Sequence, residues 1–292
     1  MTHCDVPRLR PLLRQDATKL NWPNSEAQAA QAGGSALFAG LTMPQCVEMV
    51  GYARITTFAR NERLFSQDQQ MGKLMLIKSG SVKLTQLSPD GKEVILWLNG
   101  PGDAVGMHAD ANGRNHSCSA HAMERCQAFV WEAPVVQLLI SRYPQIQINL
   151  VRILASRLSE LEERFREFAS ERVPTRLALV LTRLLKSVGR RGRKGVEVVI
   201  TREELAQMTG TTLFTISRTL SKWADSGFIA PRREGVVILD PDRLRRQAGW
   251  DGGDETEEQQ GGSGRANVVP LRTPGAQQSL GIVSLPMPPL AS

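Results

Sequence analysis

Hydroxyl and cationic side chains recur at helical spacing just after Gly210. They lie three or four residues apart, so they share one face of a helix, and that face carries no carboxylate: Thr211, Thr215, Arg218 and Lys222. Hydroxyl, guanidinium and ammonium groups are donors with which proteins contact the phosphates and base edges of duplex DNA. The pattern therefore predicts a helix that reads DNA.

Imidazole and thiol groups form a second set with metal-ligating chemistry. Three of the four histidines of the chain lie in one short region together with two cysteines: His108, His116, His121, Cys118 and Cys126. Such side chains can ligate haem iron or zinc. Their spacing is irregular, which favours the alternative that they are ordinary core and surface residues.

No signature of an enzyme accompanies either set. The sequence shows no nucleophile–base pattern, phosphate-binding loop or dinucleotide fingerprint. An enzyme is therefore not expected. A rival among binding proteins is a sensing module whose helices serve only to dock another protein, and salt-dependent DNA affinity would distinguish the two.

Two short helices must position the cationic face. Thr201 and Glu204 form a capping box that begins the first helix, and Gly210 ends it. Thr211 or Thr212 caps the second helix. The opposite face of that second helix carries four apolar side chains that are predicted to be buried: Leu213, Ile216, Leu220 and Trp223. This layout is typical of a helix–turn–helix.

A basic hairpin follows the two helices. Apolar runs at residues 228–230 and 236–239 flank a turn that contains two arginines, which predicts two short strands and hence a winged helix. Residues 171–248 carry 16 Lys and Arg against 8 Asp and Glu, in keeping with a polyanion partner. The candidate DNA contacts are Thr201, Arg202, Thr211, Thr212, Phe214, Thr215, Ser217, Arg218, Lys222, Arg232 and Arg233.

The N-terminal half has the pattern of an all-β domain. Short apolar runs between residues 55 and 131 are punctuated by glycine and proline, and Asp90-Gly91 between two such runs is a hairpin signal. Closely spaced turn signals of this kind predict a β-sandwich or jelly roll.

A long helix is predicted after Tyr143-Pro144. Its apolar side chains alternate at steps of three and four residues: Val151, Leu154, Leu158, Leu161, Phe165 and Phe168. This is the a/d pattern of a two-stranded coiled coil, so the helix is expected to pair with a second copy of the chain. The alternative is a single amphipathic helix that packs on its own β-domain.

The bulk properties exclude several protein classes. The chain has 292 residues and a formal net charge of +7. Its four cysteines, the other two being Cys4 and Cys46, are too scattered for a disulfide framework. No apolar run is long enough for a membrane span, and the first residues have no apolar signal core. We expect a cytoplasmic protein without membrane contact.

In this order, the predicted β-domain, long helix and winged helix resemble the Crp/Fnr family of bacterial transcription regulators. The likeness covers roughly residues 36–245 and rests on the stretches LIKSGSVKL (76–84), DGKEV (90–94), GPGDAVG (100–106), TREELA (201–206) and TISR (215–218). The resemblance implies an α+β fold with an N-terminal β jelly-roll (cyclic-nucleotide-binding-like) barrel, a long dimerisation helix and a C-terminal winged helix–turn–helix. It further implies a homodimer that binds an inverted repeat in double-stranded DNA, with RNA polymerase as a further candidate partner.

These expectations divide the chain into five parts. They are a disordered N-terminal segment (1–34), a cyclic-nucleotide-binding-like sensor barrel (35–142), a dimerisation helix (143–170), a winged helix–turn–helix DNA-binding domain (171–248) and a disordered tail (249–292).

The chain departs from the family at the positions that would bind a nucleotide. Cyclic-nucleotide binders carry Glu after the glycine matching Gly106 and Arg-Ser about ten residues later, where this chain has Met107 and Ser117-Cys118. Without that arginine a phosphate loses its strongest contact, so cyclic AMP is not expected to bind. Arg114 would take this role only after a loop rearrangement. The effector-pocket candidates are Gly106, Met107, His108, His116, Ser117, Cys118 and His121, and the sequence identifies no cofactor.

A further departure lies in the DNA-reading helix. Many family members carry Glu at the position of Phe214. A phenyl ring cannot accept a hydrogen bond from a cytosine amino group but can pack on a thymine methyl group. The alternative is that Phe214 packs between the two helices.

Overall fold

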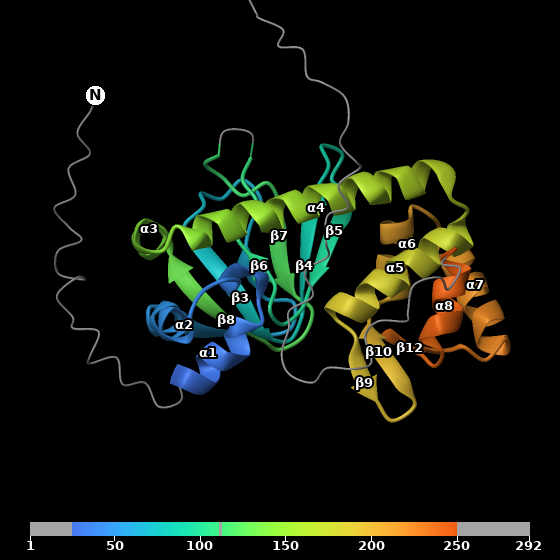
Figure 1. Ribbon diagram of the computed structural model, residues 1–292. Coiled ribbons are helices and arrows are strands. Elements are labelled where there is room, and N and C mark those ends of the chain that lie inside the picture. The colour runs from blue at the N-terminus through green and yellow to red at the C-terminus, as the bar shows by residue number, and fades with distance from the viewer. Residues whose placement is uncertain (1–24, 111–112, 250–292) are drawn as a thin grey trace, which may run out of the picture. The chain divides into compact units, whose positions relative to one another are not determined.

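The computed structural model describes residues 25–110 and 113–249. Three short helices precede the sheets (Figure 1): α1 (Ser25–Gly33), the 3-10 helix η2 (Ala36–Phe38) and α2 (Met43–Gly51). The expectation of disorder up to residue 34 is wrong for α1. Alanine favours helices, and Ala29 and Ala32 are buried in the same cluster as Leu37 and Phe38. Residues 1–24 lie outside the described part.

Two four-stranded antiparallel sheets form the β-domain, as the jelly-roll prediction requires. Their strand orders are β1-β8-β3-β6 and β2-β7-β4-β5. Gly91 has a φ of +78° in the turn between β4 and β5, which explains the Asp-Gly hairpin signal. The strands are β1 (Arg54–Phe58), β2 (Arg63–Phe65), β3 (Lys73–Ser79), β4 (Val82–Leu87), β5 (Glu93–Asn99), β6 (Ala104–Val105), β7 (Ser119–Ala122) and β8 (Cys126–Glu132).

The last strand of the β-domain ends at Glu132, and a helix occupies the remaining residues up to the predicted boundary at residue 142. Helix α3 (Ala133–Arg142) follows β8 directly, with a proline in its first turn, where the missing amide hydrogen has no cost. Helix α4 (Gln145–Ser170) comes next and corresponds to the predicted dimerisation helix. The Asn149 side chain is buried and donates to the carbonyl oxygens of Leu37 and Ala39 at 2.9 and 2.8 Å. The first turns of α4 are thereby attached to the N-terminal helices.

A third sheet and four helices form the C-terminal part. The sheet order is β11-β12-β10-β9, and the basic stretch at residues 190–195 contains the edge strand and the turn of a hairpin. The elements are α5 (Val173–Ser187), β9 (Arg190–Gly192), β10 (Gly195–Val199), α6 (Arg202–Thr209), α7 (Leu213–Asp225), β11 (Ile229–Arg232), β12 (Gly235–Ile238) and α8 (Pro241–Gln247). Residues 250–292, which include most of the predicted disordered tail, lie outside the described part.

The apolar core of the C-terminal part gathers side chains from all its helices and from the third sheet. Leu177, Leu181, Ile216 and Leu220 are fully buried there, and Ile95 and Leu98 of β5 belong to the same cluster. Among the described helices, none combines the length and the hydropathy that crossing a lipid bilayer requires.

Candidate nucleic-acid interface and effector pocket

The helix–turn–helix forms through the predicted caps. The backbone amide of Glu204 donates to Thr201 Oγ1 at 3.1 Å, and the amide of Thr201 donates to Glu204 Oε2 at 2.9 Å. Gly210 then adopts a φ of +60°, in the left-handed region that favours glycine. Thr212 caps α7 by accepting from the Thr215 amide at 3.2 Å. These local bonds fix the start of α6, the turn and the start of α7.

The buried face of α7 agrees with the sequence except at its first residue. Ile216, Leu220 and Trp223 are buried. Leu213 is 44 % exposed, so its predicted burial is wrong. It is the first residue of the helix and stands beyond the part of α7 that packs on the core.

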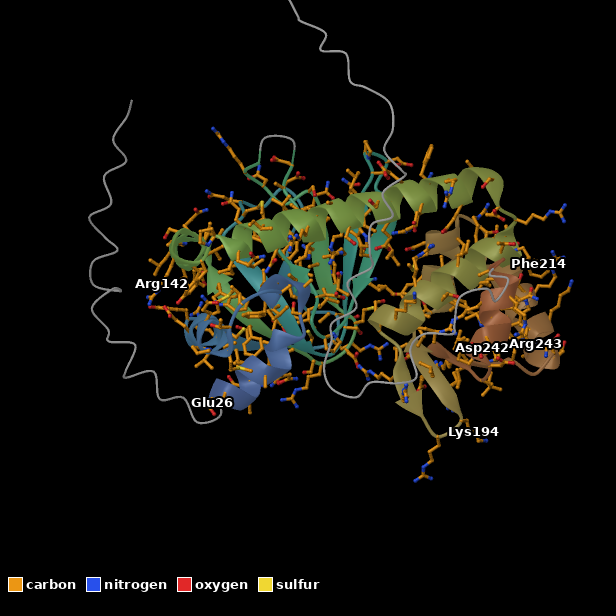
Figure 2. All side chains as sticks on the ribbon, in the orientation of Figure 1. Glu26, Arg142, Lys194, Phe214, Asp242 and Arg243 are labelled. Carbon is orange, nitrogen blue, oxygen red and sulfur yellow. The ribbon has the colours of Figure 1, made fainter. Side chains whose placement is uncertain are left out.

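The opposite face of α7 offers cations that have no partner within the described residues. Arg218 and Lys222 are exposed, and their charged side-chain groups make no hydrogen bond or ion pair there. The guanidinium of Arg202, in α6, donates to Ser217 Oγ at 3.4 Å and so lies beside the same face. Phe214 is 74 % exposed and projects from α7 into solvent (Figure 2), which excludes its packing between the two helices.

The turn between β11 and β12 presents the two arginines of the predicted wing. Arg232 Nε lies 3.8 Å from Glu197 Oε1, while Arg233 is exposed and makes no ion pair with any described residue. Four of the other candidates lie around the cationic face of α7, partly buried or exposed: Thr201, Thr211, Thr212 and Thr215. The described residues thus bring the proposed DNA contacts to one helix–turn–helix and its wing.

The effector-pocket candidates, in contrast, are distributed over several environments. Gly106 has a φ of +93°, and a Cβ there would stand 2.5 Å from the carbonyl oxygen of Lys73. Met107 packs against the N-terminal cluster, which is the apolar cluster that contains Leu37 and Phe38. Cys118, in contrast, is fully buried in the core of the β-domain. His121 is partly buried on β7. Ser117 contributes its amide, which donates to the His108 carbonyl at 3.0 Å.

His108 and His116 are buried beside aromatic rings. The His108 ring stacks on Trp97 with 5.1 Å between centroids, and the His116 ring stacks on Phe65 at 4.0 Å. Burial, helped by the positive charge of Arg157, lowers the pKa of His108 to about 4. Burial also raises the pKa of the Cys118 thiol to about 11. Among the described residues, no group of three or more His, Cys, Asp or Glu side chains is arranged to hold a metal ion.

Arg157 of α4 lies close enough to His108 and Cys118 for its charge to lower both pKa values, and it is not among the candidates predicted from the sequence. Its Nη2 donates to Asn99 Oδ1 at 2.6 Å and to the Ala104 carbonyl at 3.3 Å. Its guanidinium also lies 5.3 Å from the centre of the Trp97 ring. Arg164, seven residues later on the same face, donates to the Leu96 carbonyl. The sequence offered no signal for this side of α4, because arginine is usually exposed.

Comparisons with known proteins agree with this arrangement. The cyclic nucleotide-binding domain family matches residues 55–143, and the Crp-like helix-turn-helix domain family matches residues 175–247. The cyclic AMP receptor protein of Thermus thermophilus is 31 % identical over 208 residues, which are 71 % of this chain and 90 % of the relative. A CRP-like cAMP-activated global transcriptional regulator of Mycobacterium tuberculosis is 28 % identical over 221 residues, which are 75 % of this chain and 97 % of the relative.

Solved structures show the same fold. FixK2 from Bradyrhizobium japonicum superposes with a TM-score of 0.59 at 20 % identity, over 67 % of this chain and 96 % of that one. Of the two relatives above, the one from Mycobacterium tuberculosis is named as a transcriptional regulator.

Proposed function

Because the chain belongs to the Crp/Fnr family of DNA-binding transcription regulators, we propose that it acts as a homodimer on an inverted-repeat operator. The observation that carries the proposal is the exposed face of α7, where Arg218 and Lys222 are free to contact DNA. The two arginines of the wing would add contacts to the phosphate backbone. We place the protein in the cytoplasm, with RNA polymerase as a further candidate partner and no catalytic activity.

An apolar stripe on α4 supports the dimer. Val151, Leu154, Leu158, Phe165 and Phe168 are exposed in the single chain, at 61, 39, 58, 77 and 55 %. An uncovered apolar stripe of this length on one helix favours association with a second copy. Leu161 differs, because it packs against the core of the β-domain. The contacts of α4 are therefore compatible with both predictions for this helix. One face packs on the β-domain of the same chain, and the exposed stripe is available to a second copy.

Selection of bound sequences from random duplex DNA tests the proposal, together with sedimentation of the free protein. We expect a dimer and a pseudo-palindromic site whose half-sites lie about one helical turn apart. Affinity should fall steeply with salt, because phosphate contacts release counterions. A monomer that selects single half-sites, or a protein without sequence preference, would contradict the proposal.

We further propose that the barrel does not take cyclic AMP. The positions that would bind ribose and phosphate carry Met107 and Ser117, and Met107 packs into the N-terminal cluster. Arg157 brings a cation to the interior, but its Nη2 is already bonded to Asn99 and to the Ala104 carbonyl. Because both relatives described above are named for cyclic AMP, binding of cyclic AMP to this chain should be tested directly.

Sensing through haem or a metal finds less support. His108, His116 and Cys118 are buried. Among the described residues, however, no three His, Cys, Asp or Glu side chains lie together in a way that could hold a metal ion. Absorption spectra and metal analysis of protein purified without oxygen would test this alternative. A stoichiometric metal or a haem band that disappears in Cys118→Ala would establish it.

A further inference from the structure

Phe168 contacts the turn of the helix–turn–helix. A Cβ at Gly210 would stand 2.0 Å from Cε2 of Phe168, so the ring lies directly against the glycine. Gly210 also has the left-handed φ of +60°. Space and backbone conformation thus both require glycine here. The long helix therefore reaches the turn that joins α6 to α7.

Arg176 of α5 covers the other side of this contact. Its guanidinium carbon lies 4.9 Å from the centre of the Phe168 ring. Its Nε donates to the carbonyl of Thr209, the last residue of α6, at 3.0 Å, and Nη1 donates to the Glu171 carbonyl at 2.9 Å. One arginine thus joins the end of α4, the start of α5 and the end of α6. We call Phe168 and Arg176 the turn clamp.

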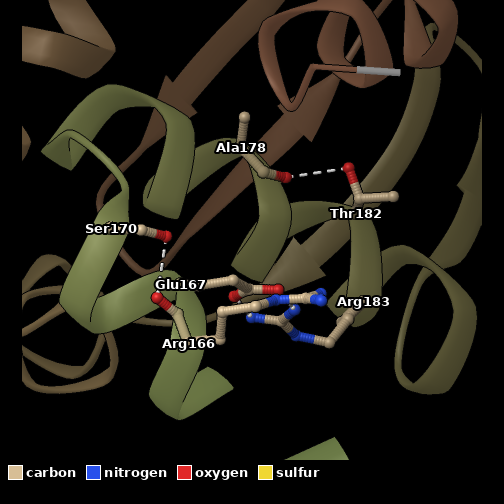
Figure 3. A network of polar contacts seen from close by, with 6 residues as sticks. All are labelled: Arg166, Glu167, Ser170, Ala178, Thr182 and Arg183. Atoms are coloured by element: carbon tan, nitrogen blue, oxygen red, sulfur yellow. Dashed lines mark hydrogen bonds and ion pairs between the residues drawn. The ribbon is translucent and has the colours of Figure 1, made fainter. Parts of the chain in front are cut away.

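A bidentate ion pair holds α4 to α5 beside the turn clamp. Glu167 accepts from both Nη atoms of Arg183 at 2.7 and 2.8 Å (Figure 3), and both side chains are largely buried. The neighbouring hydroxyls of Ser170 and Thr182 bond carbonyls of their own helices. Paired charges in a fork geometry have a defined relative orientation. The junction is therefore fixed at two points, on α5 and on the turn.

The position of Phe168 also changes the interpretation of the apolar stripe. Its spacing continues the a/d pattern, yet its ring contacts Gly210 of the same chain. Phe165, three residues earlier, is 77 % exposed and remains available to a second copy. Phe168 is itself 55 % exposed, so one edge of its ring contacts the DNA-binding domain while the rest stays accessible at the end of the stripe.

We propose that the turn clamp sets the half-site spacing that the protein accepts. The inference rests on the proposed homodimer. In such a dimer the long helices define the twofold axis, so the angle between α4 and α7 determines how far apart the two recognition helices stand. The turn clamp holds that angle at the end of α4, in addition to the contacts that Ile95, Leu98 and the Lys83–Glu204 ion pair make between the barrel and the C-terminal part. Loosening the clamp would let each recognition helix pivot and would broaden the range of spacings.

The test measures binding of full-length protein to a series of duplexes. Each carries the selected inverted repeat with its half-sites moved by up to two base pairs, and one carries a single half-site. For Phe168→Ala and Arg176→Met we expect a dimer of unchanged mass and melting behaviour close to wild type. Affinity for the preferred spacing should fall about three- to thirtyfold, while affinity for the other spacings changes much less. Flattening of the spacing preference is a result that general loss of stability would not produce.

Two matched controls accompany these variants. Phe165→Ala removes the same ring one turn earlier, and Arg172→Met removes an exposed cation one turn before Arg176. Both should keep the spacing preference of the wild type, although Phe165→Ala should weaken the dimer.

Three outcomes would overturn the proposal. One is an unchanged spacing preference in folded, dimeric Phe168→Ala. Another is a monomeric Phe168→Ala, which would make Phe168 a dimer contact. A wild-type protein that binds one half-site as tightly as the repeat would refute the proposed homodimeric function, and the spacing proposal with it.

Discussion

Arg218 is the side chain best placed to read a base. It is exposed on the cationic face of α7 and has no partner among the described residues. An arginine in the major groove can contact a guanine through two hydrogen bonds. We expect Arg218→Ala to cost about 1–3 kcal/mol of binding free energy at one base pair and to relax the preference there. Fluorescence anisotropy with single-base variants of the selected site measures this.

A cation outside the helix–turn–helix provides the control for Arg218. Arg193, in the turn between β9 and β10, is also exposed and loses the same charge when replaced by alanine. Arg193→Ala should weaken binding little and equally for all sites. An Arg218→Ala protein that loses affinity uniformly, without a change in base preference, would show that Arg218 contacts only phosphate.

Phe214 presents an apolar surface where many relatives carry a carboxylate. At 74 % exposed, its ring is available to a base pair. We expect Phe214→Glu to shift the selected half-site from a thymine contact towards one with a cytosine amino group. Repeating the selection from random DNA measures the shift. An unchanged consensus in a folded, DNA-binding variant would show that Phe214 has no part in reading the site.

His108 should make the fold sensitive to mild acid. Its pKa falls to about 4 in the folded chain because of burial, against an ordinary value of 6.5. Between these values the unfolded chain binds a proton that the folded chain does not, so stability falls as pH decreases from about 6.5 to 4. The loss through this group is about 2–3 kcal/mol. Urea unfolding at pH 4.5 and 7 should show a smaller difference in His108→Gln than in wild type. Equal differences would mean that burial does not depress this pKa.

At the scale of elements, helices and strands with clear local signals were predictable. Thr201, Glu204 and Gly210 determine α6 and its turn through bonds within ten residues, so the sequence contains the necessary information. Strand β7 has no such local signal, because Ser119–Ala122 is short and has no apolar alternation. Its place depends on pairing with β2 and β4, which are distant in sequence. Helix α1 was missed because its alanines become a core only when packed against η2.

The periodicity of apolar residues in α4 does not distinguish residues that contact the same chain from residues available to a second copy. The a/d pattern identified the apolar stripe, but it also included Leu161 and Phe168, which contact the same chain. The barrel-facing side contains Asn149, Arg157 and Arg164, whose polar groups bond backbone carbonyls and Asn99. Polar residues on a buried face have no signature of burial in a sequence. Their partners come from strands that only the fold brings near.

A charge in the apolar stripe should separate the protomers. Leu158 is 58 % exposed in the single chain, so Leu158→Asp costs little in the monomer but would place two carboxylates at the dimer contact. We expect a folded monomer with DNA affinity reduced to that of one half-site. Ser156→Asp adds the same charge at an exposed position off the stripe and should remain dimeric. Sedimentation equilibrium distinguishes the two. A dimeric Leu158→Asp that still binds the inverted repeat would refute the stripe as the dimer contact.

At the scale of the whole molecule, the order of domains was predictable and the state of the sensor was not. Short motifs identify the barrel and the winged helix, and both family matches agree with them. The content of the barrel interior depends on Trp97, Asn99 and Arg157, which come from β5 and α4. No local motif links these three residues. Met107 and Ser117 predict a barrel that does not bind a cyclic nucleotide, but they do not identify the side chains that line its interior.

Cyclic AMP provides the test of that interior. A ligand present at 100 times its dissociation constant would add about 2.7 kcal/mol to the stability of the folded state. Because this chain lacks the carboxylate and the barrel guanidinium that would hold ribose and phosphate, we expect millimolar cyclic AMP neither to raise the melting temperature nor to tighten binding to the selected DNA. The cyclic AMP receptor protein of Thermus thermophilus, at 31 % identity, is the positive control. If a clear thermal shift occurred in this protein and disappeared in Arg157→Met, Arg157 would be a phosphate ligand from α4, and the interior would be a nucleotide site of altered construction.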